Sequence, residues 1–178
     1  MGKVGFTKGT VRYTDRTVAH DVDAFPDLAE MTYDGDRVRA YETRSESIDA
    51  LLRDAVDEHP DREFVVYPEV DRRFTYCEFD RRVATIGANL RAEGVTSGDR
   101  VGLLVGNRPA FLEVFFACAR VGAVVAPVNT RLSARKSEQV LSDIDPHVLV
   151  TEAEHLSKIE TGDVRVADDD VFVHGNAD

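Results

Sequence analysis

The sequence predicts an α/β fold built on a parallel sheet, and three observations in one stretch of the chain predict it. Val101–Val105 is a short apolar run without alternation, which is typical of a strand covered on both faces. Ala110–Val121 is apolar almost all the way round and is interrupted only by Glu113 and Arg120, which indicates a largely buried helix. Ala123–Pro127 is a second apolar strand. Strand, crossover helix and strand together predict a right-handed βαβ unit.

The junctions of this unit carry their own signals. Residues 106–109, Gly-Asn-Arg-Pro, form a turn in which Pro109 suits the first helical position, because its ring presets φ and its missing N–H would have had no partner in the helix. Gly122 ends the helix. Thr96–Asp99, which contains Gly98, is a turn before the first strand.

Upstream of the unit, residues 45–60 predict an amphipathic helix. Ser47 is its expected N-cap, and Asp49 is favourably placed in its first turn. His59 and Pro60 end it, and we interpret His59 as a solvated helix-end residue rather than a catalytic one, since no partner residue is in view. One apolar stripe is expected to face inward: Ile48, Leu51, Leu52, Ala55 and Val56.

A β-hairpin and a second helix follow. Phe64–Tyr67 and Arg72–Thr75 are expected strands joined by residues 68–71. Thr75 then caps a helix, and Glu78 three residues later completes a capping box. Gly94 lies just past the end of this helix. Its buried stripe is expected to be Phe79, Val83, Ile86 and Leu90.

Downstream of the unit, Ser133–Asp145 predicts a helix that Pro146 stops. The residues expected to face inward are Val140, Leu141 and Ile144. His147–Val150 is an expected strand, and Thr151 with Glu154 matches a second capping box, which predicts a helix over residues 152–159.

The last segment and the first are harder to interpret. A strand is expected around Val171–Val173, and the acidic run Asp168–Asp170 is interpreted as solvated surface. Residues 1–44 show no sustained period, so no helix or strand is predicted there. The expected organisation is therefore a poorly defined N-terminal arm, residues 1–44, followed by an incomplete α/β domain, residues 45–178.

Composition excludes several classes of protein. A net charge of −11 argues against nucleic-acid binding, which requires clustered Lys and Arg. No run of eighteen apolar residues indicates a membrane span, and the N-terminus has no apolar signal-peptide region, so a cytoplasmic location is expected. Cys77 and Cys118 lie far apart within predicted helices, which supports neither a disulfide framework nor a zinc site and favours a reducing compartment.

The residue types that produce the net charge suggest a further hypothesis. The chain has 20 Asp and 13 Glu but only 4 Lys against 18 Arg. An Asp-rich, Lys-poor surface keeps a protein hydrated when salt screens charge repulsion, so the composition favours a salt-loving source. The alternative is an ordinary acidic protein from a mesophile.

A direct search for catalytic motifs finds none. G-x-G-x-x-G, G-x-x-x-x-G-K-[ST], G-x-S-x-G, H-E-x-x-H and C-x-x-C are all absent from the sequence. Gly98, Gly102 and Gly106 are regularly spaced, but the first two lie before and inside a strand, whereas a phosphate site needs its glycines at a helix N-terminus. The histidines at positions 20, 59, 147, 155 and 174 have no metal-ligand spacing.

Four stretches in order resemble the adenylate-forming (AMP-binding) superfamily of acyl-CoA synthetases, luciferases and peptide-synthetase adenylation domains. Residues 74–79 resemble its (T/S)-Y-x-E-(L/F) signature, and residues 94–101 resemble its G-V-x-x-G-D-R-V turn. Residues 120–129 are similar to its second core motif. Asn129-x-Arg131-Leu132 looks most like the acyl-CoA synthetase branch. The resemblance covers about residues 45–160 and implies part of the large N-terminal domain of such an enzyme.

The resemblance implies a two-step reaction. A carboxylate attacks the α-phosphate of ATP to give an acyl-adenylate and pyrophosphate, and CoA then takes the acyl group. ATP, Mg and CoA would serve the full-length enzyme. The phosphate-gripping loop, the motifs for adenine and magnesium, and the C-terminal domain with its catalytic lysine lie outside the sequence. We therefore expect no cofactor to bind this part alone and assign no catalytic, cofactor-binding or metal residue.

The residues that match the family are expected to have structural roles. Thr75 and Glu78 cap a helix, while Gly98 and Gly122 shape turns. Asn129 and Arg131 are expected to pin the exit from a strand, with Arg131 in a structural ion pair rather than in contact with substrate.

Three functional hypotheses remain open. The chain is an inactive N-terminal part of an acyl-CoA synthetase, half of a split enzyme that needs the C-terminal portion as a partner chain, or a non-catalytic interaction domain derived from the fold.

Overall fold

The computed structural model of the chain describes residues 12–13, 16–17, 28–41, 44–159, 164–166 and 171–175. Backbone contacts divide the chain into two units, Met1–Arg44 and Ser45–Asp178. None of the helices in these described ranges is long and apolar enough to cross a membrane. The acidic run at 168–170 lies outside the described residues.

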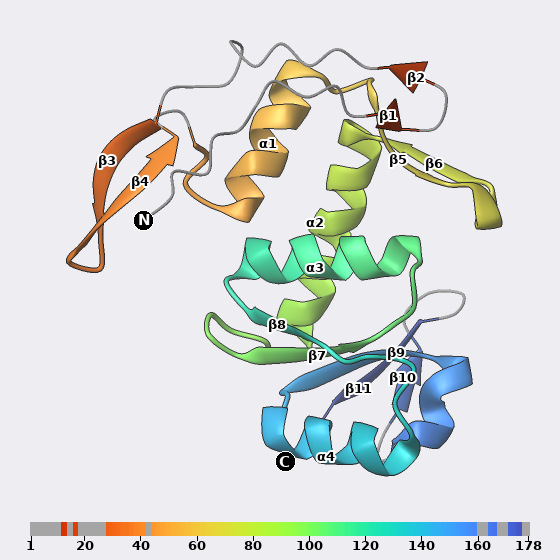
Figure 1. Ribbon diagram of the computed structural model, residues 1–178. Helices are drawn as coiled ribbons and strands as arrows, with labels where there is room; N and C mark the ends of the chain where they lie inside the picture. The colour runs from red at the N-terminus through yellow and green to blue at the C-terminus, as the bar shows by residue number, and fades with distance from the viewer. Residues whose placement is uncertain are drawn as a thin grey trace. The chain divides into compact units, whose positions relative to one another are not determined.

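A five-stranded sheet is the centre of the second unit, in the order β10-β11-β9-β7-β8 (Figure 1). The strand bounds are β7 Arg100–Leu104, β8 Val124–Pro127, β9 Val148–Glu152, β10 Val164–Val166 and β11 Val171–Gly175. Strand β7 pairs in parallel with both β8 and β9, which confirms the predicted parallel βαβ arrangement. Strand β11 pairs antiparallel with β9 and with β10.

Helices cover both faces of the parallel strands, as predicted. The helix bounds are α1 Ile48–Glu58, α2 Tyr76–Ala92, α3 Pro109–Val121 and α4 Ala134–Ile144. Alternate residues of β7 enter two hydrophobic clusters: Val101 and Leu103 pack with residues of α2 and α3, whereas Leu104 packs with residues of α4. This alternation follows from the period of two in a strand and explains why β7 is apolar throughout.

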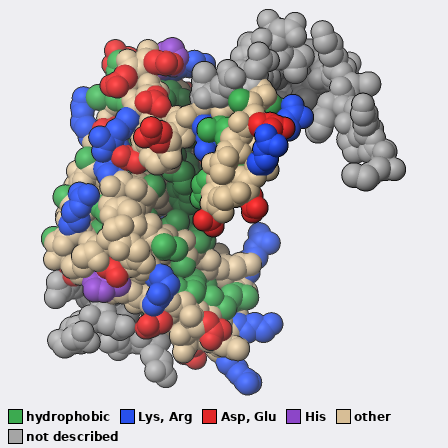
Figure 2. Space-filling view, turned by 90° about the vertical axis from the view of Figure 1, so that its left-hand side faces the viewer, with side chains coloured by type: hydrophobic (Ala, Val, Ile, Leu, Met, Phe, Trp, Pro, Cys, Tyr) green, Lys and Arg blue, Asp and Glu red, His purple; other side chains and the backbone are tan. Residues whose placement is uncertain are grey.

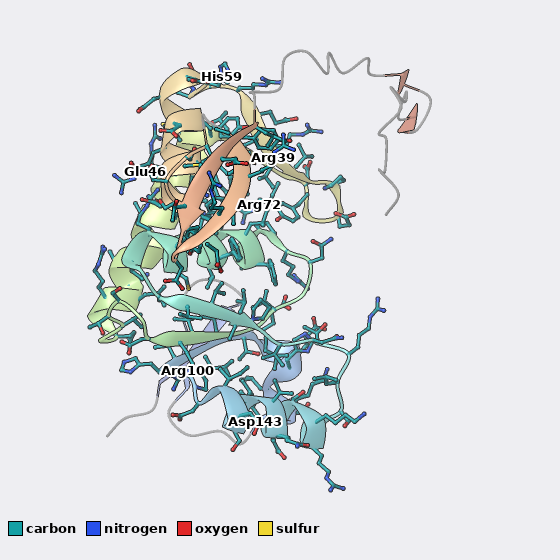
Figure 3. All side chains as sticks on the ribbon, turned by 60° about the vertical axis from the view of Figure 1, so that its left-hand side comes forward. Arg39, Glu46, His59, Arg72, Arg100 and Asp143 are labelled. Atoms are coloured by element: carbon teal, nitrogen blue, oxygen red, sulfur yellow. The ribbon has the colours of Figure 1, made fainter. Side chains whose placement is uncertain are left out.

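The ends of these helices follow the sequence signals. Helix α3 begins at Pro109 and ends at Gly122, whose φ of 80° is in the left-handed region. At the C-terminus of α4, the guanidinium of Arg100 donates hydrogen bonds to the carbonyls of Ile144 and Asp145, at 2.5 and 3.0 Å (Figure 3). This contact supplies donors for helix carbonyls that have no partner in the helix.

The β5–β6 hairpin leads into α2 as predicted. Strands β5, Glu63–Tyr67, and β6, Arg72–Thr75, pair antiparallel and are joined by the short 3-10 helix η2, Pro68–Val70. The Glu78 N–H donates to Thr75 Oγ1 at 3.2 Å, and the Thr75 N–H donates to the Glu78 carboxylate at 2.9 Å, so the capping box is confirmed. Phe64 lies 4.5 Å from Tyr76 and 5.0 Å from Phe79 between ring centroids, which fixes the hairpin on α2.

The two charged residues of α3 are themselves turned inward. Glu113 is 2% exposed and pairs with Arg82 of α2 at 2.5 Å. Arg120 pairs with Asp49 of α1 at 2.7 Å and with Asp80 of α2 at 2.5 Å. Burial opposes the charge of Arg120, but the hydrogen bonds to Asp49 and Asp80 outweigh it, and its pKa is raised. Helix α3 therefore holds α1 and α2 by ion pairs as well as by apolar packing.

The helix predicted over residues 152–159 forms as a shorter 3-10 helix, and the predicted capping box of Thr151 and Glu154 is wrong. Thr151 belongs to β9, where its hydroxyl donates to the carbonyl of Leu104 at 3.1 Å, so it is not free to cap a helix. The residues that follow form only a 3-10 helix, η3, Ala153–Lys158. Thr151 lies in β9 rather than at a helix N-cap because β-branched residues fit a buried strand.

The N-terminal unit contains strands that sequence analysis did not predict. Strands β3, Leu28–Tyr33, and β4, Asp36–Tyr41, form an antiparallel hairpin, and Arg12–Tyr13 (β1) pairs with Arg16–Thr17 (β2). Asp34 and Gly35 connect β3 to β4 with φ of 49° and 87°. Two positive φ values define a type I′ turn, which favours Asp-Gly. The sequence pair Asp34-Gly35 indicates this hairpin, although residues 1–44 show no sustained hydrophobic period.

The apolar stripe of α1 is only partly buried, contrary to expectation. Leu52 is 2% exposed, but Ile48 and Leu51 are 44% and 57% exposed. The helix itself forms as predicted, with the Ala50 N–H donating to Ser47 Oγ at 3.0 Å.

Candidate functional site

The carboxyl ends of the parallel strands define the candidate site. Helices α3 and α4 lie on opposite faces of the sheet, so the chain leaves β7 and reaches β9 from opposite sides. In open α/β sheets such a topological switch point opens the crevice in which ligands bind. Here the crevice would lie between the end of β7 and the end of β9.

The Glu152 carboxylate occupies this position. Its side chain is only 4% exposed. Oε2 accepts the N–H of Gly106 at 2.6 Å, and Oε1 lies 2.5 Å from Nε of Arg108. Gly106 and Arg108 precede α3, so the Glu152 carboxylate contacts the loop that leads into this helix. The contact joins the loop after β7 to the end of β9.

Two further titratable groups lie beside Glu152. His155 Nε2 is 3.6 Å from Glu152 Oε2 and 3.9 Å from Glu154 Oε1, and one ligand atom from each of the three residues lies within 4.8 Å of the others. Such a group could hold a metal ion in other surroundings. Here the Arg108 guanidinium already supplies the cation to Glu152, so we assign no metal to the cluster.

This cluster was not predicted from the sequence, because the spacing of His155 was compared with that of the other histidines only. The available signal was local: Glu-x-Glu-His at the end of a buried strand, which places three possible ligands on one short turn. His155 itself is 9% exposed.

The exit from β8 is organised by Asn129 and Lys158. Asn129 Oδ1 accepts the N–H of Arg131 at 2.9 Å, and the Lys158 ammonium donates to the carbonyl of Thr130. Asn129 therefore pins this turn as predicted. The expected ion pair of Arg131 is wrong: its side chain is exposed and forms no ion pair with any residue that the structure describes.

The residues of the Gly-Asp-Arg motif hold the opposite end of the sheet. Asp99 accepts the N–H and the hydroxyl of Thr96, both at 2.7 Å, and these bonds, the backbone one first, lower the pKa of the Asp99 carboxyl. The Gly98 N–H donates to the carbonyl of Gly122 at 2.9 Å. A Cβ at Gly122 would lie 2.7 Å from Ser97 Oγ, so both φ and space require glycine there. Both glycines shape turns as predicted.

The thiol of Cys118 is not an activated nucleophile. Cys118 is buried, and burial raises the pKa of its thiol to about 12. The carboxylate of Glu152, the most buried acid at the strand ends, is paired with Arg108. The residues brought together by the fold thus contact one another within a scaffold of the α/β class.

Comparison with known proteins places this scaffold in a family. Residues 52–175 match the model of the AMP-binding enzyme family, and the chain belongs to this family.

Curated proteins similar to this chain are named as acyl-CoA synthases and ligases. The chain is 40% identical over 107 residues to feruloyl-CoA synthase of an Amycolatopsis species, an overlap of 54% of this chain and 22% of the relative. It is 35% identical over 100 residues to the long-chain-fatty-acid–CoA ligase FadD13 of Mycobacterium tuberculosis, covering 56% of this chain and 20% of the relative. The chain therefore spans about a fifth of the length of these curated relatives.

Solved structures agree with this assignment. The N-terminal domain of FACL13 from Mycobacterium tuberculosis superposes with a TM-score of 0.62 at 33% identity, over 64% of this chain and 29% of that domain. The fold is thus that of part of the N-terminal domain of an adenylate-forming enzyme, as the motifs implied.

Proposed function

We propose that the chain forms the first part of the large N-terminal domain of an ATP-dependent acyl-CoA synthetase. The whole enzyme would convert a carboxylate, ATP and CoA into acyl-CoA, AMP and pyrophosphate. The observation that carries the proposal is the family match over residues 52–175 together with relatives named as acyl-CoA synthetases. ATP, Mg and CoA would be cofactors of that whole enzyme.

We propose further that this part is inactive by itself. Catalysis of acyl-adenylate formation needs donors fixed around the triphosphate, where charge develops in the transition state. The motif residues of this chain instead bond to their own backbone and to each other: Thr75 with Glu78, Asp99 with Thr96. Their role is to hold the scaffold.

Pyrophosphate exchange tests this proposal. The purified chain is incubated with ATP, Mg, labelled pyrophosphate and, in turn, ferulate and a long-chain fatty acid, the acids named by its relatives. We expect no label in ATP above the blank. Label incorporation that depends on the acid would refute inactivity.

A split enzyme is the second candidate. In this version the C-terminal portion is a separate chain and exchange requires both. Reading the genome downstream for an S/T-S-G-T-T-G-x-P-K-G loop in any frame separates both enzyme versions from a non-catalytic interaction domain. Loss of every downstream motif would favour the interaction domain.

We also propose a cytoplasmic location and adaptation to high salt. Two free cysteines fit a reducing compartment. The ratio of 20 Asp to 4 Lys fits a surface that stays hydrated in salt. A series of thermal unfolding curves in rising KCl tests the second point: we expect the Tm to rise with KCl, and a maximum at low salt would end the hypothesis.

A further inference from the structure

We draw no further inference here: the strongest candidate, the apolar face of the β3–β4 hairpin formed by Ala29, Met31, Tyr33, Val38 and Ala40, carries nothing because nothing in the described part of the structure shows what covers it, and the same holds for the hydrophobic side chains at the surface in the middle of Figure 2.

Discussion

Helices α1 and α2 both carry an amphipathic pattern, yet α2 buries more of its stripe, with only Ile86 half-buried. In α2, Phe79 and Val83 are fully buried, and Leu90 is nearly so. In α1, Leu52 is buried while its neighbour Leu51 is more than half exposed. Both helices are capped at the N-terminus by a side-chain hydroxyl, Ser47 in α1 and Thr75 in α2.

The difference comes from the number of elements that surround each helix. Helix α2 packs against α3, α1 and the β5–β6 hairpin. Helix α1 packs against α2 and α3 through the side that carries Asp49 and Leu52, and Ile48 and Leu51 lie beyond that side. A periodic pattern therefore indicates which side of a helix is apolar, but not whether another element covers all of it.

Phe79→Ala should have the largest effect. Phe79 is completely buried and contacts Phe64 and Phe116 with ring centroids at 5.0 and 5.6 Å, so its removal leaves a cavity between α2, α3 and the hairpin. We expect a loss of about 4 kcal/mol in the free energy of unfolding, measured by urea titration followed by circular dichroism. A loss below about 1 kcal/mol would mean that α2 is not the more firmly packed helix.

Arg120→Ala should come next, at about 3 kcal/mol, because the partly buried carboxylates of Asp49 and Asp80 would lose their common partner. This residue ties α1 to α2, so the variant tests whether the ion pairs keep α1 in place. Arg53→Ala is the control: Arg53 also pairs with Asp49 but is 62% exposed. Its expected cost is below about 0.5 kcal/mol. Equal losses for both variants would refute the structural role of Arg120.

Thr75→Ala should cost about 1 kcal/mol, since the Glu78 N–H loses Thr75 Oγ1 as its acceptor, while the backbone N–H of residue 75 keeps its bond to the Glu78 carboxylate. Ser47→Ala at the start of α1 likewise removes one hydrogen bond, from the Ala50 N–H. A loss of about the same size is therefore expected for Ser47→Ala in the same urea titration. A clearly larger loss for Thr75→Ala would show that the cap contributes more where the helix is packed on more sides.

Asp99→Ala tests the turn to which α2 delivers the chain, and its effect should depend on pH. Hydrogen bonds from Thr96 hold the pKa of Asp99 below its usual value of 3.8, so the ionised form is favoured in the folded state. A lowered folded-state pKa contributes stability above the unfolded pKa, and this contribution is lost as pH falls through the folded pKa.

The Tm of Asp99→Ala should therefore lie below that of wild type from pH 7 to pH 5, by less than for Thr75→Ala, and the gap should narrow below pH 3.8. Asp99→Asn keeps an acceptor without the charge and is expected to lie between the two. A gap that is independent of pH would exclude the carboxylate as its cause.

Much of the fold could be predicted because the signals were local. The capping box at Thr75, Pro109 and Gly122 at the ends of α3, and the unbroken apolar run of β7 each specify their element within a few residues. The place of Thr151 in a strand could not be predicted from a local signal. Its pairing with β7 outweighed the capping pattern that it forms with Glu154. The Asp34-Gly35 hairpin was a local signal that was overlooked.

The candidate site was less predictable, because its contacts join distant residues. Strand β9 pairs with β7 on the side opposite to β8. This pairing brings Glu152 into contact with Gly106 and Arg108. No spacing in the sequence encodes this meeting, whereas the position of Asn129 at the end of β8 was carried by a continuous motif. The roles of residues that form hydrogen bonds within their own turn could be predicted. The roles of residues whose contacts join different strands could not.

Leu51 and Leu52 give the smallest expected effect and the closest test of the comparison, since they are adjacent leucines in one helix. Leu51→Ala should change the free energy of unfolding by less than about 0.5 kcal/mol, because its side chain is mostly in water already. Leu52→Ala should cost about 3 kcal/mol by leaving a cavity against α2 and α3. Urea titrations of both variants measure the difference. If Leu51→Ala were as destabilising as Leu52→Ala, the whole stripe of α1 would be covered in solution, and the two helices would not differ in the way described.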